Sequence, residues 1–213
     1  MTRTFAFALS ALALASLVTS ASAEAQSVDR FRSSDTRLTG YFALTACCEG
    51  QLVNLDGPGD EEFDLDPGIG FGLRVEKSLA DWLALGGMFE MLAAKADGVD
   101  DRFFFMDFDV FAKVMYEIDL SGSMGLEIYG LVPFGFTIGL DGDDTFGDEV
   151  RAFGLNTGLM AGAMLILDHV GLIVEMGFRH RSVWDEYDSV FGDVDVRLGV
   201  SQFAMNFGVS AVF

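Results

Sequence analysis

A histidine and a serine two residues apart, in the run His180-Arg181-Ser182, are the first residues whose types and spacing suggest chemistry. Residues at i and i+2 share one face of a β-strand, so the imidazole of His180 would lie on the same face as the Ser182 hydroxyl. A serine beside a base is the pair from which a nucleophilic hydrolase site is built, because the base can take the proton of the serine hydroxyl. The sequence shows no phosphate-binding loop and no His/Cys metal motif.

Carboxylates are the second feature with chemical potential. The chain has 33 Asp and Glu against 13 Lys and Arg, a formal charge of −20, which excludes nucleic acid as a partner. Clustered carboxylates suit a hard cation such as Ca²⁺ or Mg²⁺, and a solvated acidic surface is the competing interpretation. We expect no other cofactor. The first candidates for a weak metal site are Asp141, Asp143, Asp144, Asp60 and Glu61.

The two cysteines are adjacent, Cys47 and Cys48. Adjacent Cα atoms lie ~3.8 Å apart, less than the ~4.4–6.8 Å of an ordinary disulfide, so a vicinal disulfide would be strained. A labile vicinal disulfide, a disulfide between chains and two free thiols all remain open.

The first 23 residues resemble a cleavable export signal. Arg3 precedes an apolar stretch over 5–18, and Ala21-Ser22-Ala23 offers the small residues at which a signal peptide is cleaved. We therefore expect export, cleavage near Ala23 and a short periplasmic N-terminal extension over 24–35. No later segment supplies the ~20 apolar residues of a membrane-spanning helix.

The rest of the chain alternates between apolar and small or polar residues. Over 203–213 the odd positions are apolar, whereas the even positions include Asn206, Gly208 and Ser210. Elsewhere the side opposite the apolar face carries charges, which inverts the pattern of a soluble sheet and fits a barrel with lipid outside and a polar lumen. A soluble lipocalin-like barrel is the competing fold, with the apolar face inward. Eight such strands are predicted, at about 37–46, 67–77, 83–95, 102–117, 124–140, 150–166, 170–184 and 194–213.

The fold class predicted is therefore all-β: an eight-stranded antiparallel transmembrane β-barrel, an up-and-down meander, forming one domain over 36–213. The connections 47–66, 96–101, 141–149 and 185–193 are expected to be mostly longer, acidic loops at one end. In the last strand the apolar residues change from even to odd numbers, which predicts a β-bulge near Ser201-Gln202.

Alternation also predicts which charges face the lumen. An eight-stranded barrel is just wide enough for side chains to fill, so these charges must pair with one another or with water. A structural network that plugs the lumen and a narrow conduit for ions or small solutes are both compatible with this set. The predicted lumen charges are Arg74, Glu76, Glu90, Asp107, Asp109, Lys113, Glu117, Glu127, Glu175, Arg179 and Arg181.

The chain end Asn206-Phe207-Gly208-Val209-Ser210-Ala211-Val212-Phe213 resembles the assembly signal of outer-membrane barrels, with Asn206, Gly208 and Phe213 as its marker residues. Together with the strand pattern, it makes the chain similar to small eight-stranded outer-membrane barrels of the OmpA/OmpX/OmpW type. The resemblance implies an outer-membrane location, contact with lipid and lipopolysaccharide, and assembly by periplasmic chaperones and the barrel-assembly machinery.

The His180/Ser182 pair resembles an element of the outer-membrane lipid A deacylases. By that resemblance Ser182 would be the nucleophile and His180 the general base, oriented by an acid from the last strand such as Asp193 or Asp195. The asparagine that follows the serine in that family is Val183 here, so an oxyanion donor is missing. The sequence therefore favours a non-enzymatic role, structural, adhesive or surface-protective. A narrow channel is the first alternative and a deacylase-like hydrolase the second. The oligomeric state and any ligand or receptor are left open.

Overall fold

The computed structural model describes residues 36–55, 60–96, 102–121, 124–141, 152–167, 169–189 and 192–212. The predicted signal peptide, the extension over 24–35 and Phe213 lie outside these ranges. No helix among the described residues is long and apolar enough to cross a membrane.

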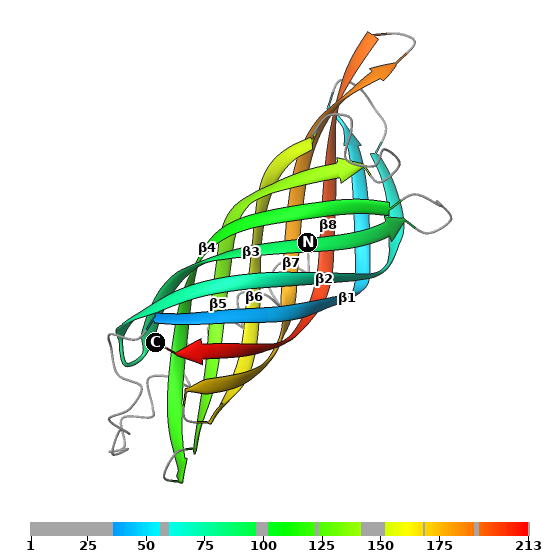
Figure 1. The fold of residues 1–213 in the computed structure, drawn as a ribbon. Coiled ribbons are helices and arrows are strands. Elements are labelled where there is room, and N and C mark those ends of the chain that lie inside the picture. Colours follow the sequence, from blue (N-terminus) through cyan, green and yellow to red (C-terminus); the bar gives the residue numbers. More distant parts are fainter. Residues whose placement is uncertain are drawn as a thin grey trace, which may run out of the picture.

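Eight antiparallel strands close into a barrel in chain order, so the predicted fold class is confirmed (Figure 1). Each strand pairs with its sequence neighbours, and β8 returns to pair with β1. The strands are β1 (Thr36–Asn54), β2 (Asp60–Ala80), β3 (Leu83–Ala96), β4 (Arg102–Ser121), β5 (Met124–Asp141), β6 (Ala152–Leu167), β7 (Val170–Ser189) and β8 (Gly192–Val212).

Both chain termini leave the barrel at the same end. Arg37 near the start of β1 pairs with Val212 at the end of β8. We call this the terminal end; it also carries the short connections β2–β3, β4–β5 and β6–β7, and the other four connections lie at the opposite, loop end. In outer-membrane barrels short turns face the periplasm and longer loops face outward.

The strand register determines the width of the barrel. A path of directly paired residues that starts at Leu126 on β5 and runs around all eight strands returns to β5 at Phe136. This stagger of about ten residues corresponds to strands tilted by roughly 35–45°. With eight strands, the interior has room for side chains and little else.

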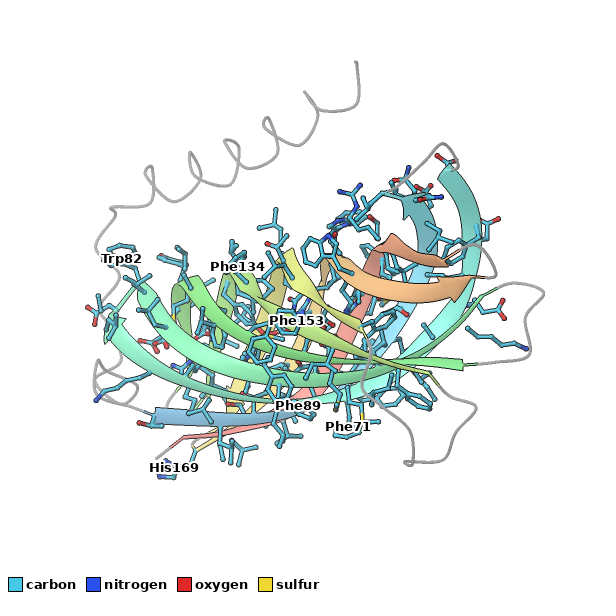
Figure 2. All side chains as sticks on the ribbon, turned by 90° about the horizontal axis from the view of Figure 1, so that it is seen from above. Phe71, Trp82, Phe89, Phe134, Phe153 and His169 are labelled. Atoms are coloured by element: carbon cyan, nitrogen blue, oxygen red, sulfur yellow. The ribbon has the colours of Figure 1, made fainter. Side chains whose placement is uncertain are left out.

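The outer face is apolar, as alternation predicts. Large apolar side chains point away from the axis on every strand; Val110 is 68% exposed and Phe134 is 55% exposed. Neighbouring rings contact one another across strands β2 to β6, with centroids 5.0–6.5 Å apart (Figure 2). An exposed apolar belt of this extent requires lipid around it. The rings are Phe71, Phe89, Phe108, Phe136 and Phe153.

Several strands are longer than predicted. Residues 48–53 of β1 pair with 60–65 of β2, so most of the segment predicted as an acidic loop over 47–66 is strand. The β7–β8 hairpin likewise continues to Ser189 and Gly192. Acidic composition alone does not distinguish a loop from a strand, because a strand tolerates carboxylates on its exposed face. Apolar residues such as Leu65 support the inner face of the extension.

The bulge predicted near Ser201-Gln202 lies on a different strand. The β7–β8 register runs without a shift from Asp193 to Ala211, so β8 has no bulge against β7. The shift occurs on β1, between Ala46 and Glu49 opposite Phe203 and Ser201, which places Cys47 and Cys48 in the bulge. The prediction failed because it required every apolar residue to face lipid, whereas Val200 points inward and is 1% exposed.

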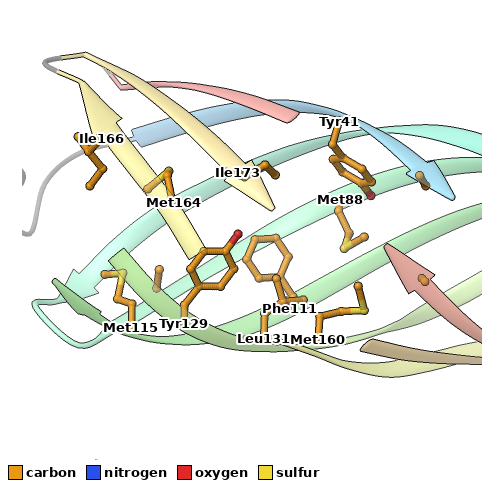
Figure 3. Packing of buried hydrophobic residues seen from close by; sticks show 13 residues of the cluster. Tyr41, Met88, Phe111, Met115, Tyr129, Leu131, Met160, Met164, Ile166 and Ile173 are labelled. Carbon is orange, nitrogen blue, oxygen red and sulfur yellow. The ribbon is translucent and has the colours of Figure 1, made fainter. Parts of the chain in front are cut away.

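Two apolar clusters line the interior. The first extends from the terminal end into the middle of the barrel and includes Tyr129, Phe111 and Met164 (Figure 3). The second cluster, nearer the loop end, contains Leu65, Leu92, Ala94, Phe105, Val183 and Val200. The charged side chains of the lumen lie between and among these apolar groups.

Candidate functional site: the barrel lumen

The charges nearest the terminal end form one connected group. Arg37 Nη1 lies 2.5 Å from Glu127 Oε2 and Arg37 Nη2 lies 3.1 Å from Glu117 Oε1. Lys113 Nζ lies 2.7 Å from Glu76 Oε1 and 2.7 Å from Glu127 Oε1. These five residues come from β1, β2, β4 and β5, so the group bridges separate parts of the wall.

A second group surrounds Glu175 on β7. Arg74 Nη1 and the Tyr129 hydroxyl each donate to Glu175 Oε1 at 2.6 Å, and Asn206 Nδ2 donates to Oε2 at 3.1 Å. The Tyr129 ring also has Lys113 Nζ 4.3 Å from its centroid. This cation–π contact connects the second group to the first.

Arg179 and Arg181, two residues apart on β7, form the third group. Arg179 Nη2 donates to Asp109 Oδ2 at 2.7 Å and to Asp107 Oδ2 at 3.1 Å. Arg181 Nη2 donates to Asp107 Oδ2 at 2.6 Å and to Glu90 Oε1 at 2.9 Å. Charge-assisted bonds with several partners are what a buried guanidinium needs, because an unpaired buried charge is very costly.

Some of these pairs cross the full width of the lumen. In a ring of eight strands, β5 lies opposite β1 and β7 lies opposite β3. The Arg37–Glu127 pair joins β1 to β5, and the Arg181–Glu90 pair joins β7 to β3. Side chains therefore meet at the barrel axis at two levels.

Glycines make room for two tyrosines in the network. A Cβ atom at Gly72 would collide with the ring of Tyr41, and one at Gly162 would collide with the ring of Tyr129. The Tyr41 hydroxyl donates to Glu90 Oε2 at 3.0 Å. Inward glycines thus place phenol groups within reach of carboxylates on other strands.

The lumen network has unequal numbers of negative and positive charges, and some of its buried polar atoms lack hydrogen-bond partners among the described residues. Its described members include seven carboxylates and five cations. Several buried polar atoms have no hydrogen-bond partner among the described residues, among them Glu76 Oε2, Asp109 Oδ1 and Gln202 Nε2. Buried polar atoms of this kind are usually satisfied by ordered water.

The sequence-predicted lumen charges all lie on the inner face of the barrel. Most are buried, whereas the Glu117 side chain is 31% exposed near the terminal end. Arg37 is a further lumen charge beyond the predicted set. It lies on the same face of β1 as Thr39, Tyr41 and Ala43, so alternation along this strand identifies it. The network also includes uncharged partners that the sequence does not predict: Tyr41, Tyr129, Asn156 and Gln202.

The assembly-signal residues divide between described and undescribed positions. Asn206 and Gly208 lie on β8, and Phe213 lies outside the described residues. The Asn206 side chain points into the lumen, where it contacts Glu175.

The candidate catalytic residues do not form the pair that hydrolysis needs. His180 and Ser182 point outward, but His180 Nδ1 lies 2.9 Å from Ser201 Oγ on β8. His180 pairs with Ser201, whereas Asp195 pairs with Glu186 further along the hairpin. At ~3.3 Å per residue, Asp195 is roughly 20 Å along β8 from Ser201, too far to orient the imidazole. Asp193 is farther still.

The metal candidates are only partly covered by the structure. Asp60 and Glu61 begin β2 and Asp141 ends β5, while Asp143 and Asp144 lie outside the described residues. Within the described part of the chain, no group of three or more His, Cys, Asp or Glu side chains is arranged to hold a metal ion. The metal site therefore remains a prediction.

A closed eight-stranded barrel with an apolar belt outside and a charged lumen defines the class of this protein: it is a small β-barrel of the outer-membrane type. The fold is similar to that of OprG, an outer membrane protein from Pseudomonas aeruginosa, with a TM-score of 0.63, 11% sequence identity, and 88% of this chain and 99% of that chain covered. It is also similar to the outer membrane protein AlkL, solved in lipid bilayers, with a TM-score of 0.52, 16% identity, and coverage of 90% and 95%.

At these identities the likeness concerns the fold. The predicted resemblance to small outer-membrane barrels is confirmed at that level, and the fold agrees with the predicted outer-membrane location. No protein-family model and no characterised protein matches the chain in sequence.

Proposed function

We propose that this protein is an outer-membrane barrel whose lumen is closed by its own charged side chains, and that its role is structural, adhesive or surface-protective. The observation that supports the proposal is the pair of contacts across the lumen, Arg37–Glu127 at 2.5 Å and Arg181–Glu90 at 2.9 Å. A permeant ion would have to separate both pairs.

The energy of separation supports a closed lumen. Removing one partner from a buried ion pair costs ~3–5 kcal/mol, because the other charge is left uncompensated. Since ~1.4 kcal/mol is a factor of ten, a state with one such pair open is populated below about one part in a hundred. A path open at both levels is rarer still.

Conductance across planar lipid bilayers tests this proposal. The mature protein should give no steady current above that of the lipid alone. The double variant Arg37→Ala/Arg181→Ala, which removes both contacts across the lumen, should conduct. Arg197→Ala is the matched control, because Arg197 is on the outward side of β8 near the loop end and is only partly buried. A steady current through the unaltered protein would overturn the proposal.

A narrow cation channel is the second candidate. It is favoured by the excess of carboxylates over cations and by the buried polar atoms that lack protein partners, because these atoms point to water within the lumen. If the unaltered protein conducts, the acid excess predicts selectivity for cations over anions. Reversal potentials in a potassium chloride gradient measure that selectivity.

The lipid A deacylase hypothesis comes last. His180 bonds Ser201 instead of Ser182, and Val183 provides no side-chain donor for an oxyanion. Purified protein should release no fatty acid from lipopolysaccharide. Release that Ser182→Ala abolishes, with the fold intact, would establish the enzymatic reading.

Outer-membrane residence also implies partners. We propose that the signal peptide is cleaved near Ala23, that chaperones and the barrel-assembly machinery deliver the chain, and that the apolar belt contacts lipid and lipopolysaccharide. A folded barrel in the outer-membrane fraction should migrate differently on gels before and after boiling. Recovery in the soluble periplasmic fraction would contradict this location.

A further inference from the structure

One strand at the terminal end extends beyond its neighbour. The pairing between β3 and β4 ends at Leu83 and Val114, although β4 continues to Ser121 (Figure 1). One further backbone bond runs from Met115 N to Trp82 O. Residues 116–121 therefore have a strand partner on one side only, β5, among the described residues. A free strand edge is a template for another extended segment.

The side of this edge that faces the mouth of the barrel is acidic. Glu117 and Asp119 are two residues apart and share one face of β4. Asp119 is exposed, and Glu117 is the only lumen charge of the described set with a substantially exposed side chain, at 31%.

The charge group behind this edge has one fewer cation than carboxylates. Three carboxylates, Glu76, Glu117 and Glu127, surround two cations, Arg37 and Lys113. The side chain of Glu76 is 2% exposed, and its Oε2 atom has no hydrogen-bond partner among the described residues. Arg74 Nε lies 3.7 Å from that atom. An incoming donor with positive charge would reduce this imbalance.

We propose that the stretch Arg30-Phe31-Arg32 of this chain adds as a short strand to the free edge of β4 at the terminal end. Arg30 and Arg32 are the only basic residues in the segment 24–35 and share one face when the stretch is extended. Their spacing matches that of Glu117 and Asp119. Phe31 then falls on the opposite face, beside the outward apolar side chains of β4, Tyr116 and Leu120, which are 44% and 50% exposed.

The reach of the segment is sufficient. Arg37, near the start of β1, already contacts Glu117 at 3.1 Å, so this part of β1 lies within one arginine–glutamate pair of β4. The three residues between Arg32 and Thr36 make four Cα–Cα steps, which span up to ~13 Å of extended chain. Across the whole lumen, the described carboxylates exceed the cations by two. Within the segment only the stretch 30–32 is basic, because the other charged residues are Glu24, Asp29 and Asp35.

Photo-crosslinking of the mature protein in detergent micelles tests the contact. A benzoylphenylalanine that replaces Phe31 should crosslink to the peptide containing residues 116–121, identified by mass spectrometry. The backbone amides of 116–121 should also exchange hydrogen about tenfold more slowly than in the variant Arg30→Glu/Arg32→Glu, from the backbone bonds and two ion pairs gained. Asp119→Lys, outside the buried network, should lower the crosslink yield in the same way.

The control keeps both arginines and adds the same negative residues at positions of opposite parity, Ser27→Glu/Ser33→Glu. It should retain the crosslink and the slow exchange. Crosslinks to other parts of the barrel, or equal exchange rates in the arginine variant and the unaltered protein, would overturn the proposal. Because only purified protein is present, slow exchange that depends on the arginines also excludes a separate basic protein as the occupant.

Discussion

Replacement of Arg181 by methionine is the sharpest test of the lumen network. Arg181 is fully buried, and its guanidinium contacts Asp107 at 2.6 Å, Glu90 at 2.9 Å and Gln202 at 2.5 Å. Methionine keeps an apolar stem near the ring of Phe105, over which the guanidinium now lies at 5.6 Å. The substitution therefore removes the charge and its hydrogen bonds while most of the side-chain volume stays.

The expected loss in the free energy of unfolding depends on the contacts that Asp107 and Glu90 keep when Arg181 is replaced. Asp107 keeps Arg179 at 3.1 Å, whereas Glu90 keeps only the neutral hydroxyl of Tyr41 at 3.0 Å. Breaking a buried pair from one side costs ~3–5 kcal/mol. Since Asp107 retains one cation, we expect a loss of about 3 kcal/mol in the free energy of unfolding. Adding Glu90→Gln should recover about 1–2 kcal/mol, because the uncompensated carboxylate is then neutral.

Urea unfolding from lipid vesicles, followed by tryptophan fluorescence, measures both values. Trp82 and Trp184 are 56% and 41% exposed on the outer surface, so their emission reports whether the barrel remains in lipid. Arg197→Met is the control and should change stability by less than about 0.5 kcal/mol. A cost below about 1 kcal/mol for Arg181→Met, with no coupling to Glu90→Gln, would refute the view that these charges hold the lumen together.

Three further predictions address the outer face, the cysteines and the acidic end. Phe108→Arg should destabilise the barrel by ~2–4 kcal/mol, since it places a charge between Phe89 and Phe136 in the lipid-facing belt. Phe108→Leu should cost much less. Equal losses in the free energy of unfolding for the two variants, measured by urea titration, would contradict the face assignment. Cys47 and Cys48 should be oxidised in the exported protein, within one chain or between chains, and complete thiol labelling of a monomer on a non-reducing gel would exclude both forms. Weak binding of Ca²⁺ or Mg²⁺, with Kd on the order of 10⁻⁴–10⁻³ M, is expected at Asp141, Asp143, Asp144, Asp60 and Glu61. Calorimetry should give a saturable heat, and calcium should protect the loops from proteolysis better than sodium does at the same ionic strength. No saturable heat and equal protection by the two salts would leave only a solvated acidic surface.

The architecture could be predicted from sequence because one rule, alternation, acts on every strand. An apolar residue such as Val110 and its charged neighbour Asp109 must point to opposite sides, and the lipid decides which side is which. The same rule fails where the inside is also apolar. Val200 and Leu65 face inward near the loop end, so parity alone could not locate the bulge at Cys47 and Cys48.

The partners within the lumen could not be predicted, because a contact across the barrel depends on the stagger of eight strands at once. Arg37 and Glu127 are far apart in the sequence and on opposite strands, and no local pattern connects them. The uncharged residues of the network could not be predicted either, because their contacts also depend on the strand register. Tyr129 looks like an ordinary strand aromatic until the register shows that Gly162 leaves space beside it.

The contacts across the lumen also constrain the order in which the barrel can form. Arg37 on β1 reaches Glu127 on β5 only when the sheet has curled far enough to bring opposite strands together, and the β1–β8 seam closes that curl. Until then each charge must stay hydrated, since an ion stripped of water without a partner is unstable by many kcal/mol. Seam closure is therefore coupled to the loss of water from those charges that pair across the lumen. The transition state for insertion should be an open, water-filled sheet whose charges still face solvent.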